Sequence, residues 1–108
     1  MKLSDIRDAL LTVTEDTFHY HAHKKPNKYI VWAEDTESGA SHADDKKRMQ
    51  VIQGTIDYFT KMEFDPNFNL IQEKVNSLDI AWELNSIQYE EDTKYIHYEW
   101  VWEMILDG

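Results

Sequence analysis

The sequence has no cysteine, and glycine and proline are rare. Without cysteine, disulfide frameworks, thiolate catalysis and cysteine-ligated zinc or iron–sulfur sites are excluded, and a reducing, cytosolic compartment is favoured. The only glycines, Gly39, Gly54 and Gly108, are too scattered to form a loop that cradles a phosphate. Nucleotide binding by such a loop is therefore excluded.

Long apolar runs are also missing. No run approaches the roughly 18 residues that a membrane-spanning helix needs. The first residues, from Met1 to Asp5, open directly into an amphipathic pattern. We expect neither secretion nor contact with a membrane.

Basic residues are few compared with acidic ones. Eleven Lys and Arg stand against 21 Asp and Glu, which gives a formal net charge of −10. Such a surface repels a phosphate backbone, whereas a groove-binding protein needs cations that release counterions. We expect no specific nucleic-acid binding.

Apolar and aromatic residues are present in the amounts that a packed core requires. They make up 42% and 13% of the 108 residues, which excludes a disordered chain. The length suits one ordinary domain, so we predict a single domain over residues 1–108.

Two segments show the three- and four-residue spacing of an amphipathic helix. The first covers residues 4–13, with Ser4 as its N-cap. The second covers residues 66–77, with Asp65 as its cap and Pro66 in its first turn. The predicted buried stripes are Leu3, Ile6, Leu10 and Val13 in the first helix, and Phe68, Ile71, Val75 and Leu78 in the second.

Alternating or continuously apolar segments predict strands over residues 17–23, 29–33, 49–59, 80–89 and 95–104. Gly54 interrupts the third of these and predicts a bulge or a close backbone contact. The last two are joined by the polar turn 90–94 and should pair as a hairpin. The predicted fold is α+β in the order α-β-β-β-α-β-β. Two helices pack on one face of a four- to five-stranded sheet that is mostly antiparallel. A mixed sheet, with at least one parallel pair, is the alternative.

Three histidines alternate along the first predicted strand. His19, His21 and His23 would project from one strand face, and such spacing can supply two ligands to zinc or nickel. No motif completes a metal site, and a solvated strand face is the simpler interpretation. The acidic stretches at Glu90–Asp92 and at Asp35 and Glu37 lack the order of a calcium-binding loop. We assign no catalytic residue, no metal ligand and no cofactor.

Aromatic residues share one face of the last predicted strand. Tyr98, Trp100 and Trp102 alternate there, opposite His97, Glu99 and Glu103, and core packing against the helices is the default interpretation. A ligand platform or a subunit contact is the alternative. Apolar surface at Trp32 and Tyr29 exceeds what two short helices can cover, which suggests that part of it is buried between subunits.

Several runs of the chain resemble the tail terminator or tail completion proteins of long-tailed phages and prophages of Gram-positive bacteria. These runs are 29–34 (YIVWAE), 54–60 (GTIDYFT), 65–68 (DPNF), 85–93 (NSIQYEEDT) and 95–100 (YIHYEW). The resemblance covers nearly the whole chain, but it rests on scaffold segments and not on a catalytic signature.

The resemblance implies a non-enzymatic virion subunit. Such subunits form a hexameric ring that caps the tail tube and joins it to the head. The free protein would be either a monomer or an assembled ring. Its partners would be the tail tube protein and a head-completion or connector protein. The alternative within this group is a component of the adjacent neck. It would occur in the host cytoplasm during assembly and then in the virion tail or neck.

Two sets of residues are candidates for this role. The polar segment 34–45 is predicted to be mobile in the free subunit and to order on assembly. Its candidate assembly residues are Glu34, Asp35, Thr36, Glu37, Ser38, Gly39 and His42. The candidates for an acidic channel lining are Asp35, Glu37, Glu90, Glu91 and Asp92. The alternative function is a small metal- or ligand-binding domain that uses the His19, His21 and His23 face.

Overall fold

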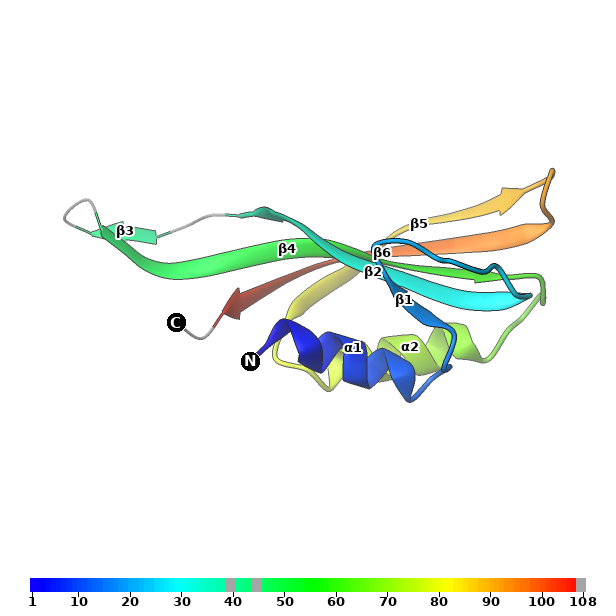
Figure 1. Ribbon diagram of the computed structural model, residues 1–108, viewed down its shortest axis with the longest axis horizontal. Coiled ribbons are helices and arrows are strands. Elements are labelled where there is room, and N and C mark those ends of the chain that lie inside the picture. Colours follow the sequence, from blue (N-terminus) through cyan, green and yellow to red (C-terminus); the bar gives the residue numbers. More distant parts are fainter. Residues whose placement is uncertain (39–40, 44–45, 107–108) are drawn as a thin grey trace.

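The computed structural model describes residues 1–38, 41–43 and 46–106. Two helices pack on one face of a single twisted sheet, which confirms the predicted α+β fold (Figure 1). In chain order the elements are α1 (Leu3–Leu11), β1 (Thr17–His19), β2 (Lys28–Glu37), β3 (Ser41–Ala43), β4 (Lys46–Thr60), α2 (Asn67–Asn76), β5 (Ala81–Glu90) and β6 (Tyr95–Leu106). The short strand β3 is the one element that the predicted order lacks.

The main path of the sheet runs β1-β2-β4-β6-β5, and β3 pairs with the outer part of β4. All pairs are antiparallel except β1 with β2, so the sheet is mixed. The register of β4 with β6 is unbroken from Gln50 opposite Leu106 to Thr60 opposite Ile96, and these two strands form the centre. The predicted hairpin is β5 with β6.

The main core lies between the helices and the facing side of the sheet. The two-residue alternation of β6 turns Tyr98, Trp100 and Trp102 toward the helices, and all three are buried. The indole Nε1 of Trp100 donates to Oε1 of Gln72 on α2 at 3.2 Å. The predicted aromatic stripe is therefore core packing, where each large side chain contributes about 1.5–3 kcal/mol of burial.

A second apolar cluster occupies the opposite face of the sheet. Phe18, Tyr29 and Tyr95 are buried there beneath the connection between β1 and β2, residues 20–27. The hydroxyl of Tyr95 donates to the carbonyl oxygens of Lys25 and Pro26 at 3.0 and 2.7 Å. The chain itself thus covers Tyr29. Trp32 belongs to the main core, so neither residue needs a neighbouring subunit to be buried, contrary to the expectation.

The first strand is shorter than predicted. It ends at His19 because Tyr20 adopts a left-handed backbone with φ of 69°, and the chain then turns over the second cluster. Burial of Phe18 and Tyr29 favours this turn over a longer strand. The strand predicted over residues 17–23 is therefore correct to His19 and wrong for residues 20–23.

The helix caps also differ in detail from the prediction. Helix α1 begins one residue before Ser4, because the carboxylate of Asp5 accepts the backbone N–H of Lys2 at 2.8 Å. The predicted cap at Ser4 is wrong, since that residue lies inside the helix. In α2 the N-cap is Pro66 and the helix begins at Asn67, one residue later than predicted. Asp65 nevertheless satisfies a donor at this helix start, because its Oδ1 accepts the backbone N–H of Asn67 at 2.9 Å.

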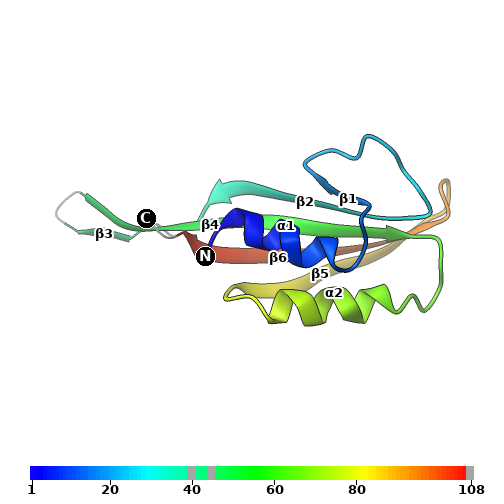
Figure 2. The same ribbon diagram turned by 60° about the horizontal axis from the view of Figure 1, so that its bottom comes forward.

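An arm extends beyond the two helices at one end of the molecule (Figure 2). We define it as β3 with residues 46–49 of β4, which lie past the end of β6 and pair with β3. Residues 34–37, predicted to be part of a mobile tip, continue β2 as a strand with a register shift between Glu34 and Thr36. His42 lies in β3, whereas Gly39 lies outside the described residues.

Gly54 sits at the closest approach within the sheet. A Cβ at this position would lie 2.0 Å from the carbonyl oxygen of Ala33 and 2.5 Å from the indole ring of Trp102. The predicted close backbone contact is confirmed. The bulge is on the neighbouring strand β2, where the register shifts between Glu34 and Thr36.

Candidate functional surfaces

The sheet face turned away from the helices carries a set of carboxylates. We call it the acidic face and define it by Asp35, Asp57, Glu83, Glu99 and Glu103. Alternation along β4 and β6 places Asp57 directly opposite Glu99, on the side opposite the aromatic core. Like charges across strands disfavour pairing by a fraction of a kcal/mol. Asp57 and Glu99 therefore repel each other across the two strands.

Neutral side chains hold two of these carboxylates in place. The amide of Asn85 donates to Oε1 of Glu99 at 2.6 Å, and the hydroxyl of Ser38 donates to Oε1 of Glu103 at 3.0 Å. Because these donors carry no charge, they orient the carboxylates without neutralising them. The negative charge of Glu99 and Glu103 is therefore presented at the surface.

A groove of about 430 Å³ runs across the acidic face. Its lining includes Asp35, Thr55, Glu83 and Glu103, which come from four different strands. Asp35 is the extra residue of the β2 bulge, so the bulge brings its carboxylate to the groove. Gly54 contributes only its backbone to this lining, because a side chain there would point to the helix side of the sheet, toward Trp102.

Asp57 is the member of the acidic face with a histidine partner. Its Oδ1 lies 2.7 Å from Nε2 of His97, and Nδ1 of His97 lies 3.8 Å from a carboxylate oxygen of Glu90. The ring of His97 stacks on Phe59 with centroids 4.2 Å apart. The hydrogen bond to Asp57 raises the pKa of His97 above 6.5, although burial opposes the shift. The pair therefore keeps the proton of His97 to a higher pH than a free imidazole would.

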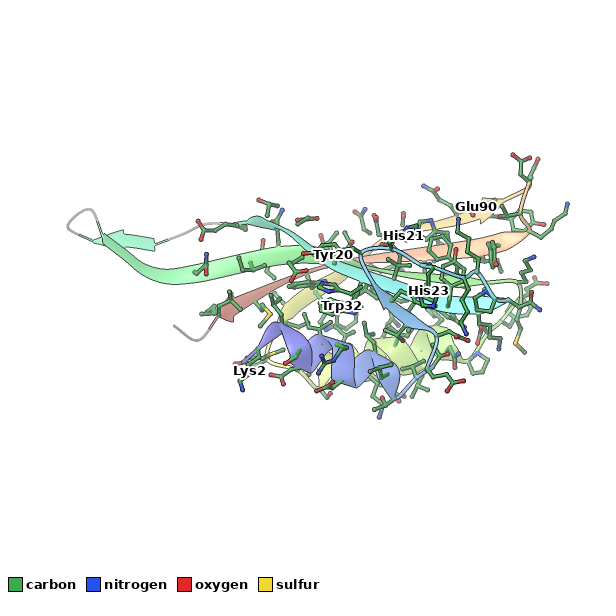
Figure 3. All side chains as sticks on the ribbon, in the orientation of Figure 1. Lys2, Tyr20, His21, His23, Trp32 and Glu90 are labelled. Atoms are coloured by element: carbon green, nitrogen blue, oxygen red, sulfur yellow. The ribbon has the colours of Figure 1, made fainter. Side chains whose placement is uncertain are left out.

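The three histidines of the metal hypothesis do not meet on one strand face. The ring of His19 stacks on Trp32 on the helix side, with centroids 4.0 Å apart, and its Nε2 contacts Glu34. His23 packs edge-on against Phe18 in the second cluster, at 4.8 Å. Figure 3 shows His21 and His23 on the connection between β1 and β2. Within residues 1–38, 41–43 and 46–106, no three side chains of ligand type are grouped to hold a metal ion.

Glu34 has a structural role beside His19. Burial by itself raises the pKa of this carboxyl, but hydrogen bonds from Tyr20 and His19 outweigh burial and lower the pKa below 4.5. The ring of Tyr20 stacks on the other side of His19 at 4.1 Å. The cluster therefore fixes the turn at Tyr20, which makes Glu34 a structural residue as well as an assembly candidate.

The predicted acidic candidates lie at three places. Asp35 lies on the acidic face, whereas Glu90, Glu91 and Asp92 lie at the turn between β5 and β6. Figure 3 shows Glu90 at the far end of β5. Glu37 is the last residue of β2, and one of its carboxylate oxygens accepts from the amide of Gln50 at 2.8 Å.

Sequence reasoning did not select four acidic-face residues, namely Asp57, Glu83, Glu99 and Glu103. Their signal was present in part, because Glu99 and Glu103 alternate with the aromatic stripe on β6. The position of Glu83 depends on the pairing of β5 with β6, where it lies opposite Val101.

The chain matches no known protein-family model, and no curated protein is significantly similar to it in sequence. Neither helix in the described part of the chain is long and apolar enough to cross a bilayer.

Proposed function

We propose that this chain is a structural subunit of a phage or prophage tail, a tail terminator or tail completion protein. Six copies form a ring that caps the tail tube and joins it to the head, and the acidic face lines the channel. The acidic face is the observation that carries this proposal. The resemblance of the runs at 29–34, 54–60, 65–68, 85–93 and 95–100 supports it.

The physical argument concerns DNA that must pass without sticking. Six copies would carry a formal charge of about −60, and a carboxylate wall repels the phosphate backbone. Glu99 and Glu103 are oriented by neutral donors, so their charge is directed at whatever faces the sheet. The repulsion acts within about 8 Å at physiological ionic strength, and added salt shortens this range.

A closed ring needs two different surfaces on each subunit, because a head-to-tail contact joins unlike patches. The described part of the chain measures 52 × 25 × 24 Å, and its two ends are dissimilar. One end carries the arm and the other carries the turn between β5 and β6 (Figure 1). Such a shape suits a ring subunit, with the remaining surfaces left for the tail tube protein and the head-completion protein.

Deletion of this chain from a phage that encodes it tests the proposal. We expect tubes of uncontrolled length and heads without joined tails in electron micrographs of the lysate, restored by supplying the chain in trans. The matched control is a deletion complemented by a chain with a frameshift. Normal tails of uniform length joined to heads in the deletion strain would contradict the proposal.

A further inference from the structure

A second, larger groove lies on the helix side of the sheet, at the end opposite the arm. We call it the apolar groove; its volume is about 1120 Å³. Its lining comes from the connection between β4 and α2, the first turn of α2, and the facing sides of β5 and β6. The residues that carry the argument are Phe64, Phe68, Ile87, Tyr89, Ile96 and Tyr98.

The groove exists because α2 leaves part of the sheet uncovered. The ring of Phe68 packs on the ring of Tyr98, with centroids 4.6 Å apart, and closes the core there. Ile87 and Tyr89 pair with Tyr98 and Ile96 and so lie on the same sheet face, yet they are 56% and 58% exposed. An isolated chain gains nothing from exposing two such side chains in one place.

Phe64 adds an aromatic side chain in an unfavourable backbone conformation. Its φ is 57°, in the left-handed region that a bulky residue rarely adopts, and its side chain is 89% exposed. The next residue, Asp65, is buried and hydrogen-bonded to Tyr58 and Asn67, so the corner is held rigidly. Local strain that presents an exposed aromatic ring is typical of a binding anchor.

An unpaired strand edge lies beside the groove. Strand β5 is the last strand of the sheet path, and among the described residues it pairs only with β6. Its register is regular from Ser86 to Glu90, after a shift between Leu84 and Ser86. A partner can therefore add backbone hydrogen bonds along the edge while its side chains enter the groove.

Runs of opposite charge occur at the two ends of the molecule, each with charges of the other sign close in sequence: Asp44 and Asp45 precede the basic run, and Lys94 follows the acidic one. Residues 90–92 are the only three consecutive acidic residues in the sequence, and they form the turn beside the groove. Residues 46–48 are the only three consecutive basic residues, and they lie on β4 within the arm. Figure 1 shows the arm and this turn at opposite ends of the long axis. Opposite charges at opposite ends favour head-to-tail contact between copies.

We propose that the apolar groove receives the arm of a second copy of this chain. The basic run 46–48 of the arm meets the acidic turn 90–92, and Phe64, Ile87 and Tyr89 form the apolar centre of the contact. The inference rests on the proposed ring, because a head-to-tail contact that repeats and closes gives one. It goes further by assigning the two surfaces that join.

Cysteine cross-linking tests the contact directly, because the native chain has no thiol. Proteins with Arg48→Cys and Tyr89→Cys are mixed and oxidised, both in free solution and with assembling tails. We expect a disulfide-linked heterodimer on a non-reducing gel. The control pairs Arg48→Cys with Leu11→Cys, since Leu11 is also exposed, at 42%, but lies outside the groove. A yield no higher than this control in both settings overturns the proposal.

Anchor and charge variants give a second readout by sedimentation. Phe64→Ser should weaken self-association by about 30-fold, the effect of removing one strong anchor, whereas Leu11→Ser should leave it within about 2-fold. Circular dichroism checks that each variant is folded. Self-association unchanged by Phe64→Ser would mean that the groove takes another partner, and would overturn the proposal.

Charge reversal tests the pairing of the two ends. Reversing the acidic end with Glu91→Lys and Asp92→Lys should weaken association, as should reversing the arm with Lys47→Glu and Arg48→Glu. Combining both reversals in one chain should restore association. If the combined variant is as weak as either parent, the two ends do not meet.

These outcomes separate the inference from the proposed function. Rings of six that lack the cross-link would support the proposed function and contradict the proposed contact. A cross-link in open-ended polymers that never close into rings would support the proposed contact and contradict the proposed function.

Discussion

Replacing Asp65 with alanine removes the buried acceptor that holds the corner between β4 and α2. The hydroxyl of Tyr58 donates to Oδ2 of Asp65 at 2.6 Å, and the backbone N–H of Asn67 donates to Oδ1 at 2.9 Å. Nζ of Lys28 lies 3.4 Å from Oδ2. The corner presents Phe64 to the apolar groove, so its stability and the shape of the groove are linked.

The expected cost comes from two lost interactions. A hydrogen bond from a hydroxyl to a buried carboxylate contributes about 1.5–3 kcal/mol, and loss of a helix cap costs about 1 kcal/mol. Asp65→Ala should therefore lower the free energy of unfolding by about 2.5–4 kcal/mol. For a domain of this size, the midpoint of thermal unfolding should fall by about 15–25 °C. Asp65→Asn keeps an acceptor oxygen and should cost less.

Urea unfolding followed by tryptophan fluorescence measures the change, with Glu63→Ala as a control for an exposed neighbour. The control should stay within about 0.5 kcal/mol of the wild type. A double-mutant cycle with Tyr58→Phe should give a coupling of at least about 1 kcal/mol. A cost below about 1 kcal/mol for Asp65→Ala, or no coupling to Tyr58, would refute the assignment of the corner to this network.

The dependence on pH follows from the same contacts. Burial alone would raise the pKa of Asp65, but the hydrogen bonds from Tyr58 and Asn67 lower it below 3.8. A carboxyl whose pKa is lower when folded stabilises the protein above pH 3.8 and loses that contribution as the pH falls through the folded value. Asp65→Asn should therefore flatten the acid side of the stability profile.

Three further predictions concern the sheet. Gly54→Val should cost at least about 3 kcal/mol in urea unfolding, because its Cβ would overlap Trp102, and a cost below about 1 kcal/mol would contradict that packing. The pKa of His97 is raised in the folded state, so its contribution to the free energy of unfolding is present below pH 6.5 and is lost as the pH rises through the folded value. His97→Gln should remove this pH dependence of stability. An unchanged dependence would exclude the pair with Asp57. Virions with Glu103→Lys should release DNA more slowly, and salt should relieve the delay; release at the wild-type rate at low salt would leave solubility as the reason for the charge.

The fold was predictable where local patterns survive packing. On β6 the two-residue alternation holds from Tyr98 to Met104 and correctly assigns the buried face. On β1 the same alternation fails after His19, because a long-range contact decides the path: the hydroxyl of Tyr95 binds the carbonyl of Pro26, 69 residues earlier. No local pattern contains that contact.

The functional surfaces were predictable only in part. The acidic residues of β6 were visible opposite the aromatic stripe, but Glu83 joins them only through strand pairing. Asp35 reaches the groove through a bulge, which depends on the register of β2 against β4. The apolar groove depends on the left-handed backbone of Phe64, and residue type gives no signal for that conformation.

Addition of the purified chain to polymerising tail tube protein tests the central claim most directly. Electron microscopy with image averaging then records tube length and the structure at each tube end. The account predicts that elongation stops and that a ring with sixfold symmetry caps one end of each tube. Tubes that continue to grow, with bare ends at every concentration of the chain, would contradict it.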